Sequence, residues 1–326
     1  MSLGFFAGIF IAQWPHLRPE VASVHAERMD HLFFFLTGVT LFFTFLIFGA
    51  IFYFMIKYRR RSETERPPAT RDSRILEITW IVIPSLICIV LFFWGARLFF
   101  AAFNPPQGAM EIFVVGKQWM WHLQHPEGPR EINQLHVPVD VPIVLTMTSE
   151  DVIHGFFLPE FRIKRDVVPG RYLSEWFQAT KTGTYHLFCT QYCGALHSGM
   201  RGTLEVMSPT EYAEWLRDNA TAESMTQMGR QLFTRLGCDT CHLADGSGTG
   251  PALEGRFGKP VTLASGESRV VDESFVRQSI LDPGSLPLPN YRPVMPTFRG
   301  QVNEEQILQL IAYIKSLGSS ERSQTP

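Results

Sequence analysis

Residues Cys189 to Met200 place four side chains that can bind a soft metal ion in one short segment. The segment reads CTQYCGALHSGM, with Cys189 and Cys193 four residues apart and His197 four residues further on. A second imidazole, His154, lies upstream in EDVIHGF. Thiolate, thioether and imidazole together favour copper over magnesium, calcium or manganese. Two thiolates in one loop can bridge two metal ions, and no position is open for a substrate. The sequence therefore predicts a site that passes electrons.

Two other interpretations of this segment are open from the residues alone. Cys-x-x-x-Cys could close a small loop as a disulfide in an oxidising compartment. The two cysteines with His154 and His197 could also form a tetrahedral zinc site. Met200 argues against zinc, because a thioether is a poor zinc ligand and a familiar copper ligand. Copper, zinc and a disulfide thus remain alternatives at this point.

A second motif, GCDTCH, supplies Cys238, Cys241 and His242. C-x-x-C-H is the covalent attachment signature of c-type haem. The two thiols add to the vinyl groups of the haem, and the adjacent histidine becomes the proximal ligand of the iron. A thioredoxin-like C-x-x-C is the alternative, but the adjoining histidine and the absence of a βαβ pattern argue against it. The sequence therefore predicts a covalently bound haem c.

Met295, in YRPVMPTF, is the candidate for the opposite axial position of that haem. Pro293 and Pro296 would stiffen the loop and fix the thioether towards the iron, and methionine opposite histidine raises the reduction potential. Met225 and Met228 are competing candidates, but they lie in the helix expected before the haem motif and should pack there. Met295 is therefore preferred.

Two uncharged apolar runs, Leu32–Ile56 and Ile78–Ala96, predict a transmembrane hairpin. At 1.5 Å per residue each can cross a hydrocarbon core of about 30 Å. The connection is rich in cations, which belong on the cytoplasmic side by the positive-inside rule: Lys57, Arg59, Arg60, Arg61, Arg66, Arg71 and Arg74. Both termini, and everything after Phe103, are then expected outside.

The composition agrees with a small membrane part joined to soluble domains. The chain has 326 residues, a formal net charge of −2 and 45% hydrophobic residues, including 27 Phe. Nothing in the charge argues for a nucleic-acid partner. Four of the five cysteines fall in the two motifs, and Cys88 is expected to be a small core hydrophobe. The short apolar stretch Met1–Trp14 lacks the features of a signal peptide.

The residues from about 109 to 207 read as a small β-domain. Glu111–Val115, Ile143–Met147 and Thr203–Val206 are rich in strand formers and are separated by Pro and Gly, which predicts an antiparallel barrel or sandwich. The metal-binding residues would then occupy loops at one end. Trp119 and Trp121 alternate and are expected to face the same side of one strand.

Residues 32–207 resemble subunit II of a haem–copper cytochrome c oxidase. The resemblance implies a cupredoxin domain holding a dinuclear copper centre, CuA. Cys189 and Cys193 would bridge both ions, His154 and Met200 would complete one, and His197 with the backbone carbonyl of Gln191 would complete the other. Gln191 stands where most relatives carry a glutamate that helps to bind magnesium, which makes magnesium at the subunit interface doubtful here.

The resemblance also implies roles for Trp119, as the point where electrons are accepted, and for Glu77, as the entrance of a proton path into subunit I. Beyond Met207, Ser208–Asp218 is expected to be a helix. The rest is similar to a class I cytochrome c, in which the loop Gly250–Leu253 packs over the proximal histidine and Glu304–Leu317 forms the closing helix.

The whole chain is similar to subunit II of a caa-type oxidase with a fused cytochrome c. The resemblance implies a respiratory, proton-pumping complex in a bacterial membrane, with subunit I and subunit III as partners. The electron donor would be an external cytochrome c or a quinol–cytochrome c oxidoreductase. The short linker would make the meeting of the two carriers intramolecular, at an effective concentration of roughly millimolar. The expected domains are an outer or interfacial segment (residues 1–30), a transmembrane hairpin (31–105), a CuA domain (106–218), a cytochrome c domain (219–318) and a disordered tail (319–326).

Three other functions share part of this pattern. A nitric oxide reductase subunit with CuA would share most motifs, and a membrane-anchored electron carrier would need no oxidase partner. A Sco-type copper chaperone would have Cys-x-x-x-Cys but would not need His197, Met200 or a haem motif. Quinol oxidase subunits lack the copper ligands. The resemblance therefore favours an oxidase subunit whose oxygen-reducing site lies in another chain.

Overall fold

The computed structural model describes residues 18–66, 72–219 and 223–318. They form two compact units, one of His25–Asn104 and one made of the residues before and after it. The expectations for the first 17 residues, for residues 220–222 of the linker and for the tail at 319–326 lie outside the described residues.

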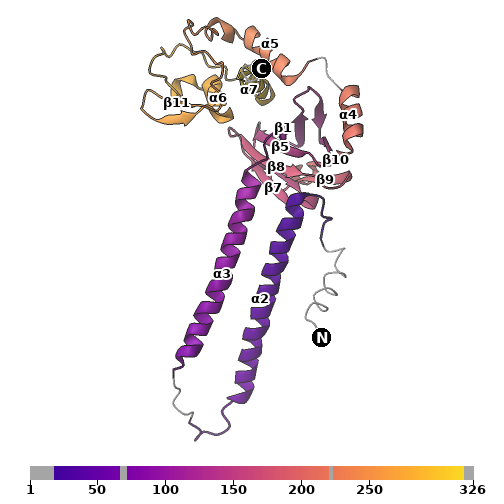
Figure 1. Cartoon of the computed structure of the whole chain (residues 1–326), viewed down its shortest axis with the longest axis vertical. Coiled ribbons are helices and arrows are strands. Elements are labelled where there is room, and N and C mark those ends of the chain that lie inside the picture. Colours follow the sequence, from indigo (N-terminus) through magenta and orange to yellow (C-terminus); the bar gives the residue numbers. More distant parts are fainter. Residues whose placement is uncertain (1–17, 67–71, 220–222, 319–326) are drawn as a thin grey trace, which may run out of the picture. The chain divides into compact units, whose positions relative to one another are not determined.

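The smaller unit is a hairpin of α2 (Val24–Lys57) and α3 (Arg74–Phe103), which run side by side (Figure 1). Both helices are long and apolar enough to cross a membrane, and both extend beyond the apolar runs predicted for them. Hydroxyl groups are satisfied within the helices, as when Thr37 Oγ1 donates to the carbonyl of Phe33 at 2.8 Å. Such internal bonding is what a segment surrounded by lipid requires. Cys88, expected in a packed core, is exposed on α3.

The larger unit begins with a sandwich of two five-stranded sheets. The strands of the first, in spatial order, are β3 (Arg130–Ile132), β2 (Met120–Gln124), β1 (Met110–Lys117), β5 (Pro142–Ser149) and β8 (Leu173–Gln178). Those of the second are β4 (Gln134–Pro138), β10 (Arg201–Met207), β9 (Gly183–Cys189), β6 (His154–Leu158) and β7 (Ile163–Val167).

The three predicted strands fall within β1, β5 and β10, but the sheets are mixed. β1 pairs with β5, and β4 with β10, in parallel, so the expectation of a purely antiparallel domain is wrong. The reason is the connection: the chain leaves β1, forms β2 and β3, crosses to β4 in the other sheet, and returns to lie beside β1 in the same direction. Trp121, Phe156 and Leu187, each at most 1% exposed, fill the space between the sheets.

The helix α4 (Pro209–Asp218) follows the sandwich, as predicted, and Ser208 caps it with Glu211 in a reciprocal capping box. The C-terminal part contains α5 (Met225–Arg235), α6 (Glu273–Leu281) and α7 (Glu304–Ser316), with a short hairpin of β11 (Pro260–Thr262) and β12 (Ser268–Val270).

The helices α5 and α7 cross at Gly229. A Cβ added there would lie 1.9 Å from the carbonyl oxygen of Gln309, so only glycine allows this approach. Leu232, Ile307 and Ile311 pack around the crossing, each at most 4% exposed. The predicted closing helix is thus confirmed, and its role is to pack against the helix that leads into the haem motif.

Candidate metal and haem sites

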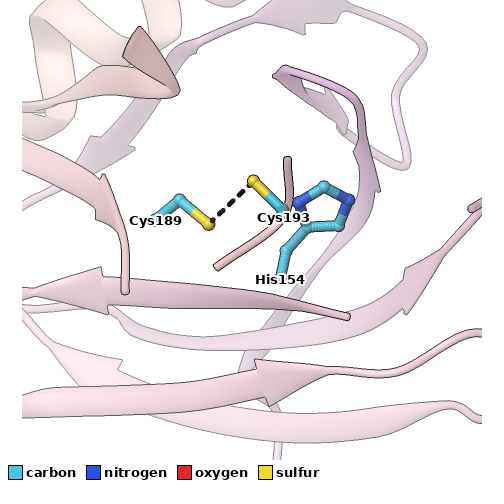
Figure 2. A group of neighbouring side chains, drawn as sticks. All are labelled: His154, Cys189 and Cys193. Atoms are coloured by element: carbon cyan, nitrogen blue, oxygen red, sulfur yellow. Dashed lines mark hydrogen bonds between the residues drawn. The ribbon is translucent and has the colours of Figure 1, made fainter. Parts of the chain in front are cut away.

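The predicted copper ligands come together at one end of the sandwich (Figure 2). His154 opens β6 and Cys189 ends β9, and these two strands pair so that Phe156 lies opposite Cys189. The loop that follows β9 turns back on itself, because Cys189 N–H donates to Met200 O at 3.2 Å and His197 N–H donates to Gly194 O at 3.1 Å. Two neighbouring strands and one folded loop therefore position donors that are distant in the sequence.

The donor atoms lie within contact distance of one another. Cys189 Sγ is 3.7 Å from Cys193 Sγ and 3.2 Å from the carbonyl oxygen of Gln191. Cys193 Sγ is in turn 3.5 Å from His197 Nδ1 and 3.8 Å from Met200 Sδ. Both thiols are free. A tetrahedral zinc ion needs four ligands, whereas this cluster offers six donors, which fits two metal ions better than one.

His154 provides the observation that tests whether these residues fit a metal. The residue is fully buried, and its Nε2 lies 2.8 Å from Asp151 Oδ1. Its Nδ1 is buried without a hydrogen-bond partner among the described residues. A buried ring nitrogen left unpaired is costly. His154, Cys189 and Cys193 form the one group of possible metal ligands found in the described part of the chain, and the orphaned nitrogen is what a metal ligand looks like without its ion.

The ionisation of the two thiols is uneven. Burial alone would raise the pKa of Cys189, but the adjacent His154 side chain and the backbone of Gly155 and Gln191 lower it to about 6. Burial and the neighbouring Cys189 raise the pKa of Cys193 well above its usual value. One thiol therefore ionises readily, and the second requires positive charge beside it. Bound cations supply that charge and deprotonate coordinating thiols.

Trp119 contacts the loop of residues 189–200, called the copper loop below, but it does not share a strand with Trp121 as the sequence pattern predicted. It lies in the turn between β1 and β2, while Trp121 is on β2 and fully buried in the core, so the two do not share one strand. Trp119 Nε1–H donates to the carbonyl oxygen of Cys193 at 3.1 Å, and Gln118 Nε2–H donates to the same oxygen at 2.8 Å. The prediction from the alternating tryptophans is wrong because a turn separates the two strands between Lys117 and Met120.

Gln118 and Asp151 support the site from outside. Asp151 accepts a hydrogen bond from Gln118 N–H at 2.7 Å and also contacts His154 Nε2 at 2.8 Å. A carboxylate on the second nitrogen of a ligand histidine fixes the orientation of the ring. Sequence reasoning missed Gln118, and no pattern marks a glutamine in a turn as a support for a loop about 75 residues away.

The haem motif lines a separate cavity of about 500 Å³ in the C-terminal part. The cavity is lined by the three residues of the haem motif, Cys238, Cys241 and His242, and by Met295, which lies later in the sequence. Its other walls are mainly apolar. The predicted ligand Met295 is thus placed in the same cavity as His242. Met225 and Met228 are absent from its lining within the described residues and pack against a neighbouring apolar cluster instead.

His242 is oriented by the Gly250–Leu253 loop, which was predicted to pack over it. His242 Nδ1 is 2.8 Å from the carbonyl oxygen of Pro251, which can only accept, so Nδ1 carries the proton and Nε2 keeps its lone pair. A Cβ on Gly250 would lie 2.8 Å from Cε1 of the same ring. The ring is therefore held in place and presents a free nitrogen, which fits a haem iron ligand.

Three further histidines of the sandwich make contacts with carboxylates. His125 and His136 both contact Glu131, at 2.8 and 2.5 Å. Burial would raise the pKa of Glu131, but the hydrogen bonds with these two histidines outweigh burial and lower it. His186 contacts Glu160 at 3.2 Å. The group of possible metal ligands found among the described residues contains His154 and does not include these three.

The haem-binding part is packed directly on the first sheet of the sandwich. Phe113 and Val115 on β1 form one buried cluster with Met225 and Leu308. Beside it, Lys315 of α7 donates to Glu111 of β1 at 2.8 Å. The two modules are thus joined by contacts as well as by the linker.

Two ion-pair groups flank that apolar cluster. Lys315 also pairs with Glu273 of α6 at 2.7 Å. On the other side, Glu304 pairs with Arg277 and accepts a hydrogen bond from Tyr172 Oη at 3.2 Å. Tyr172 belongs to the sandwich, and the other residues belong to the haem-binding part.

Comparison with known proteins agrees with this arrangement. Three protein families match the chain. The transmembrane domain of cytochrome c oxidase subunit II matches residues 13–98, and the periplasmic domain of that subunit matches residues 130–207. The cytochrome c family matches residues 226–318. Cytochrome c oxidase subunit 2 of Alkalihalophilus pseudofirmus is 30% identical over 287 residues, which cover 83% of this chain and 82% of that protein. The chain belongs to the cytochrome c oxidase subunit II family.

Other relatives cover smaller shares of the chain. The subunit 2 of a Synechocystis oxidase is 29% identical over 260 residues, covering 64% of this chain and 78% of that protein. A crystal structure of the periplasmic domain of subunit II from Bradyrhizobium japonicum is 32% identical, covers 36% of this chain and 96% of that chain, and has a TM-score of 0.35. Membership of the family, with a fused cytochrome c domain, implies that this subunit of an oxidoreductase complex carries copper and haem c.

Proposed function

We propose that this subunit accepts electrons at a haem c bound to its C-terminal part and passes them through a dinuclear CuA centre to the haem–copper site of subunit I. The observation that carries the proposal is the buried, unpaired Nδ1 of His154 beside two free thiols 3.7 Å apart. A donor set of two thiolates, two imidazoles, one thioether and one carbonyl oxygen suits a bridged copper pair, which would share one electron with little rearrangement.

The residues proposed to hold copper are those placed in contact above: His154, Cys189, Gln191 through its carbonyl, Cys193, His197 and Met200. Their rigidity is supplied by β6, β9 and the folded loop rather than by the metal. Asp151 and Gln118 keep the donors oriented, and the hydrogen bond from Trp119 to Cys193 supports this tryptophan as the residue through which electrons reach the copper loop.

The residues proposed to hold haem c are Cys238 and Cys241 as thioether attachments, with His242 and Met295 as axial ligands. His242 is held by the carbonyl oxygen of Pro251. Histidine–methionine ligation gives a high potential, as a late respiratory carrier needs.

The hairpin is proposed to anchor the subunit in a bacterial cytoplasmic membrane. With its basic connection on the cytoplasmic side, both redox sites lie on the periplasmic or outer side. Glu77, in the first turn of α3, then lies near the cytoplasmic surface and is proposed as the entrance of a proton path into subunit I. Subunit III and an external cytochrome c or quinol–cytochrome c oxidoreductase are the further partners proposed for a proton-pumping complex.

Metal analysis and spectra of the purified complex test the copper assignment. We expect two copper ions on this subunit, a mixed-valence absorption, and low-spin haem c. Cys193→Ser should abolish the mixed-valence absorption and leave the haem c spectrum intact. A single zinc ion, or an oxidised Cys189–Cys193 bridge, would refute the proposal. Consumption of oxygen, rather than nitric oxide, by the same preparation tests the reaction of the complex.

A further inference from the structure

Two arginines and a histidine gather at one end of the helical hairpin, outside every site described above. Arg28 and His31 lie in the first turns of α2, and Arg97 lies near the end of α3. They line a cavity of about 480 Å³ between the two helices, whose remaining walls are apolar and aromatic, formed by Phe93, Trp94 and Leu98. The cavity lies entirely within the hairpin.

The sequence places this cavity at the surface of the hydrocarbon layer. His31 directly precedes the apolar run of α2, and Arg97 directly follows the apolar run of α3. Aromatic side chains close the apolar side, where the rings of Phe35 and Trp94 are 5.5 Å apart. Tryptophan with flanking cations is the pattern of the boundary between lipid tails and headgroups, so the cavity opens at headgroup level.

The two arginines have no counter-ion among the described residues that line the cavity. No carboxylate lines it, and neither arginine forms an ion pair with the residues that the structure describes. Two guanidinium groups facing one space repel each other unless an anion lies between them. In the topology proposed above they would also lie outside, where arginines are disfavoured near membrane helices. A bound anion removes both objections.

We propose that this cavity binds the phosphate of an anionic phospholipid. The planar guanidinium forks of Arg28 and Arg97 suit phosphate oxygens, and His31 can donate one further hydrogen bond. Exposed phenylalanines further along α2, such as Phe42 and Phe45, offer apolar surface that suits the acyl chains. A zwitterionic lipid is a poorer ligand because its ammonium group would approach two fixed positive charges. Basic pockets between membrane helices recognise anionic headgroups in this way.

The test is lipid binding to the assembled, delipidated complex, measured by native mass spectrometry with phosphatidylglycerol as the probe. Each arginine near an anionic headgroup contributes a factor of roughly five in affinity, so Arg28→Gln with Arg97→Gln should weaken one bound phosphatidylglycerol by about 30-fold. Phosphatidylcholine binding should not change. Arg230→Gln with Arg235→Gln removes two exposed charges from α5 and serves as the matched control.

Two outcomes would overturn the proposal. One is unchanged phosphatidylglycerol affinity in the double variant. The other is loss of partner subunits with lipid binding unaltered, which would assign the cavity to an acidic segment of a neighbouring subunit. If the double variant does not assemble, a photoreactive phosphatidylglycerol added to the unaltered complex should label peptides that contain Arg28 or Arg97. Labelling confined to other peptides would equally reject the site.

Discussion

Replacing Lys315 with methionine should loosen the contact between the haem-binding part and the β-sandwich. Lys315 Nζ pairs with Glu111 at 2.8 Å and with Glu273 at 2.7 Å. Methionine keeps the length of the side chain and its packing over Phe113 and Phe257, so the charge is the main loss. The two carboxylates would then face each other without a cation between them.

The size of the effect follows from burial. Exposed ion pairs contribute about 0–1 kcal/mol, while removing one partner of a fully buried pair costs roughly 3–5 kcal/mol. The Lys315 side chain is 23% exposed and its partners are 30% and 25% exposed, so the network lies between these limits. We expect a cost of about 2 kcal/mol, which is a factor of roughly 30 in the balance between packed and separated modules.

This network should not respond to pH in the neutral range. Burial alone would lower the pKa of Lys315, but Glu111 and Glu273 raise it above its usual value. A lysine whose folded pKa is raised contributes stability that is fully present below its unfolded pKa of about 10.4 and is lost only as pH rises through the folded value. High salt, in contrast, should weaken the contact.

Hydrogen–deuterium exchange of the full chain measures the opening. Amides of β1 and α7 should exchange up to about 30-fold faster in Lys315→Met if opening exposes them. Lys259→Met, at an exposed position, is the matched control. Adding Glu273→Gln to Lys315→Met should recover part of the protection, because it removes one of the repelling carboxylates. Equal protection in the Lys315 and Lys259 variants would refute this account of the interface.

Four further predictions concern single residues. Met295→Ala should lower the midpoint potential of haem c in a redox titration, and an unchanged potential would reject this residue as a ligand. Gly250→Ala would place a methyl group 2.8 Å from the His242 ring, so the low-spin haem spectrum should change; an unaltered spectrum would contradict the close packing. Glu77→Gln should slow oxygen consumption while copper and haem c contents stay normal, and undiminished turnover would exclude the proton-path role. Burial would raise the pKa of Glu131, but hydrogen bonds from two histidines lower it, so the stability that Glu131 contributes is present above about pH 4.5 and is lost as pH falls through the lowered pKa. Glu131→Gln should therefore flatten the acid side of a plot of unfolding temperature against pH. An unchanged slope would contradict this role of Glu131.

Much of the chemistry could be predicted because it is local. The haem motif and the copper loop each concentrate their cysteines and a histidine within a few residues, and a covalent haem attachment needs that spacing. The two membrane helices were equally accessible, since an uncharged run long enough to span a bilayer has few alternatives. The closing helix followed from its apolar periodicity.

What could not be predicted depends on contacts between distant segments. The alternation of Trp119 and Trp121 fits a strand, and only the pairing of β1 with β2 shows that Trp119 lies in the turn before the strand that carries Trp121. That turn brings Gln118 and Trp119 onto the carbonyl oxygen of Cys193, about 75 residues later in the chain. Local patterns carry no information on such a pairing.

The interface between the modules changes how the fusion should be understood. The sequence suggested two carriers that meet because a short linker keeps them near each other. The apolar cluster of Phe113 with Leu308, and the pairing of Lys315 with Glu111, instead hold the haem-binding part against the sandwich. A linker alone raises the frequency of encounters, whereas a packed interface fixes one orientation. If electrons pass in that orientation, their rate should fall in Lys315→Met in proportion to the separated fraction. A purely tethered pair would be insensitive to the substitution.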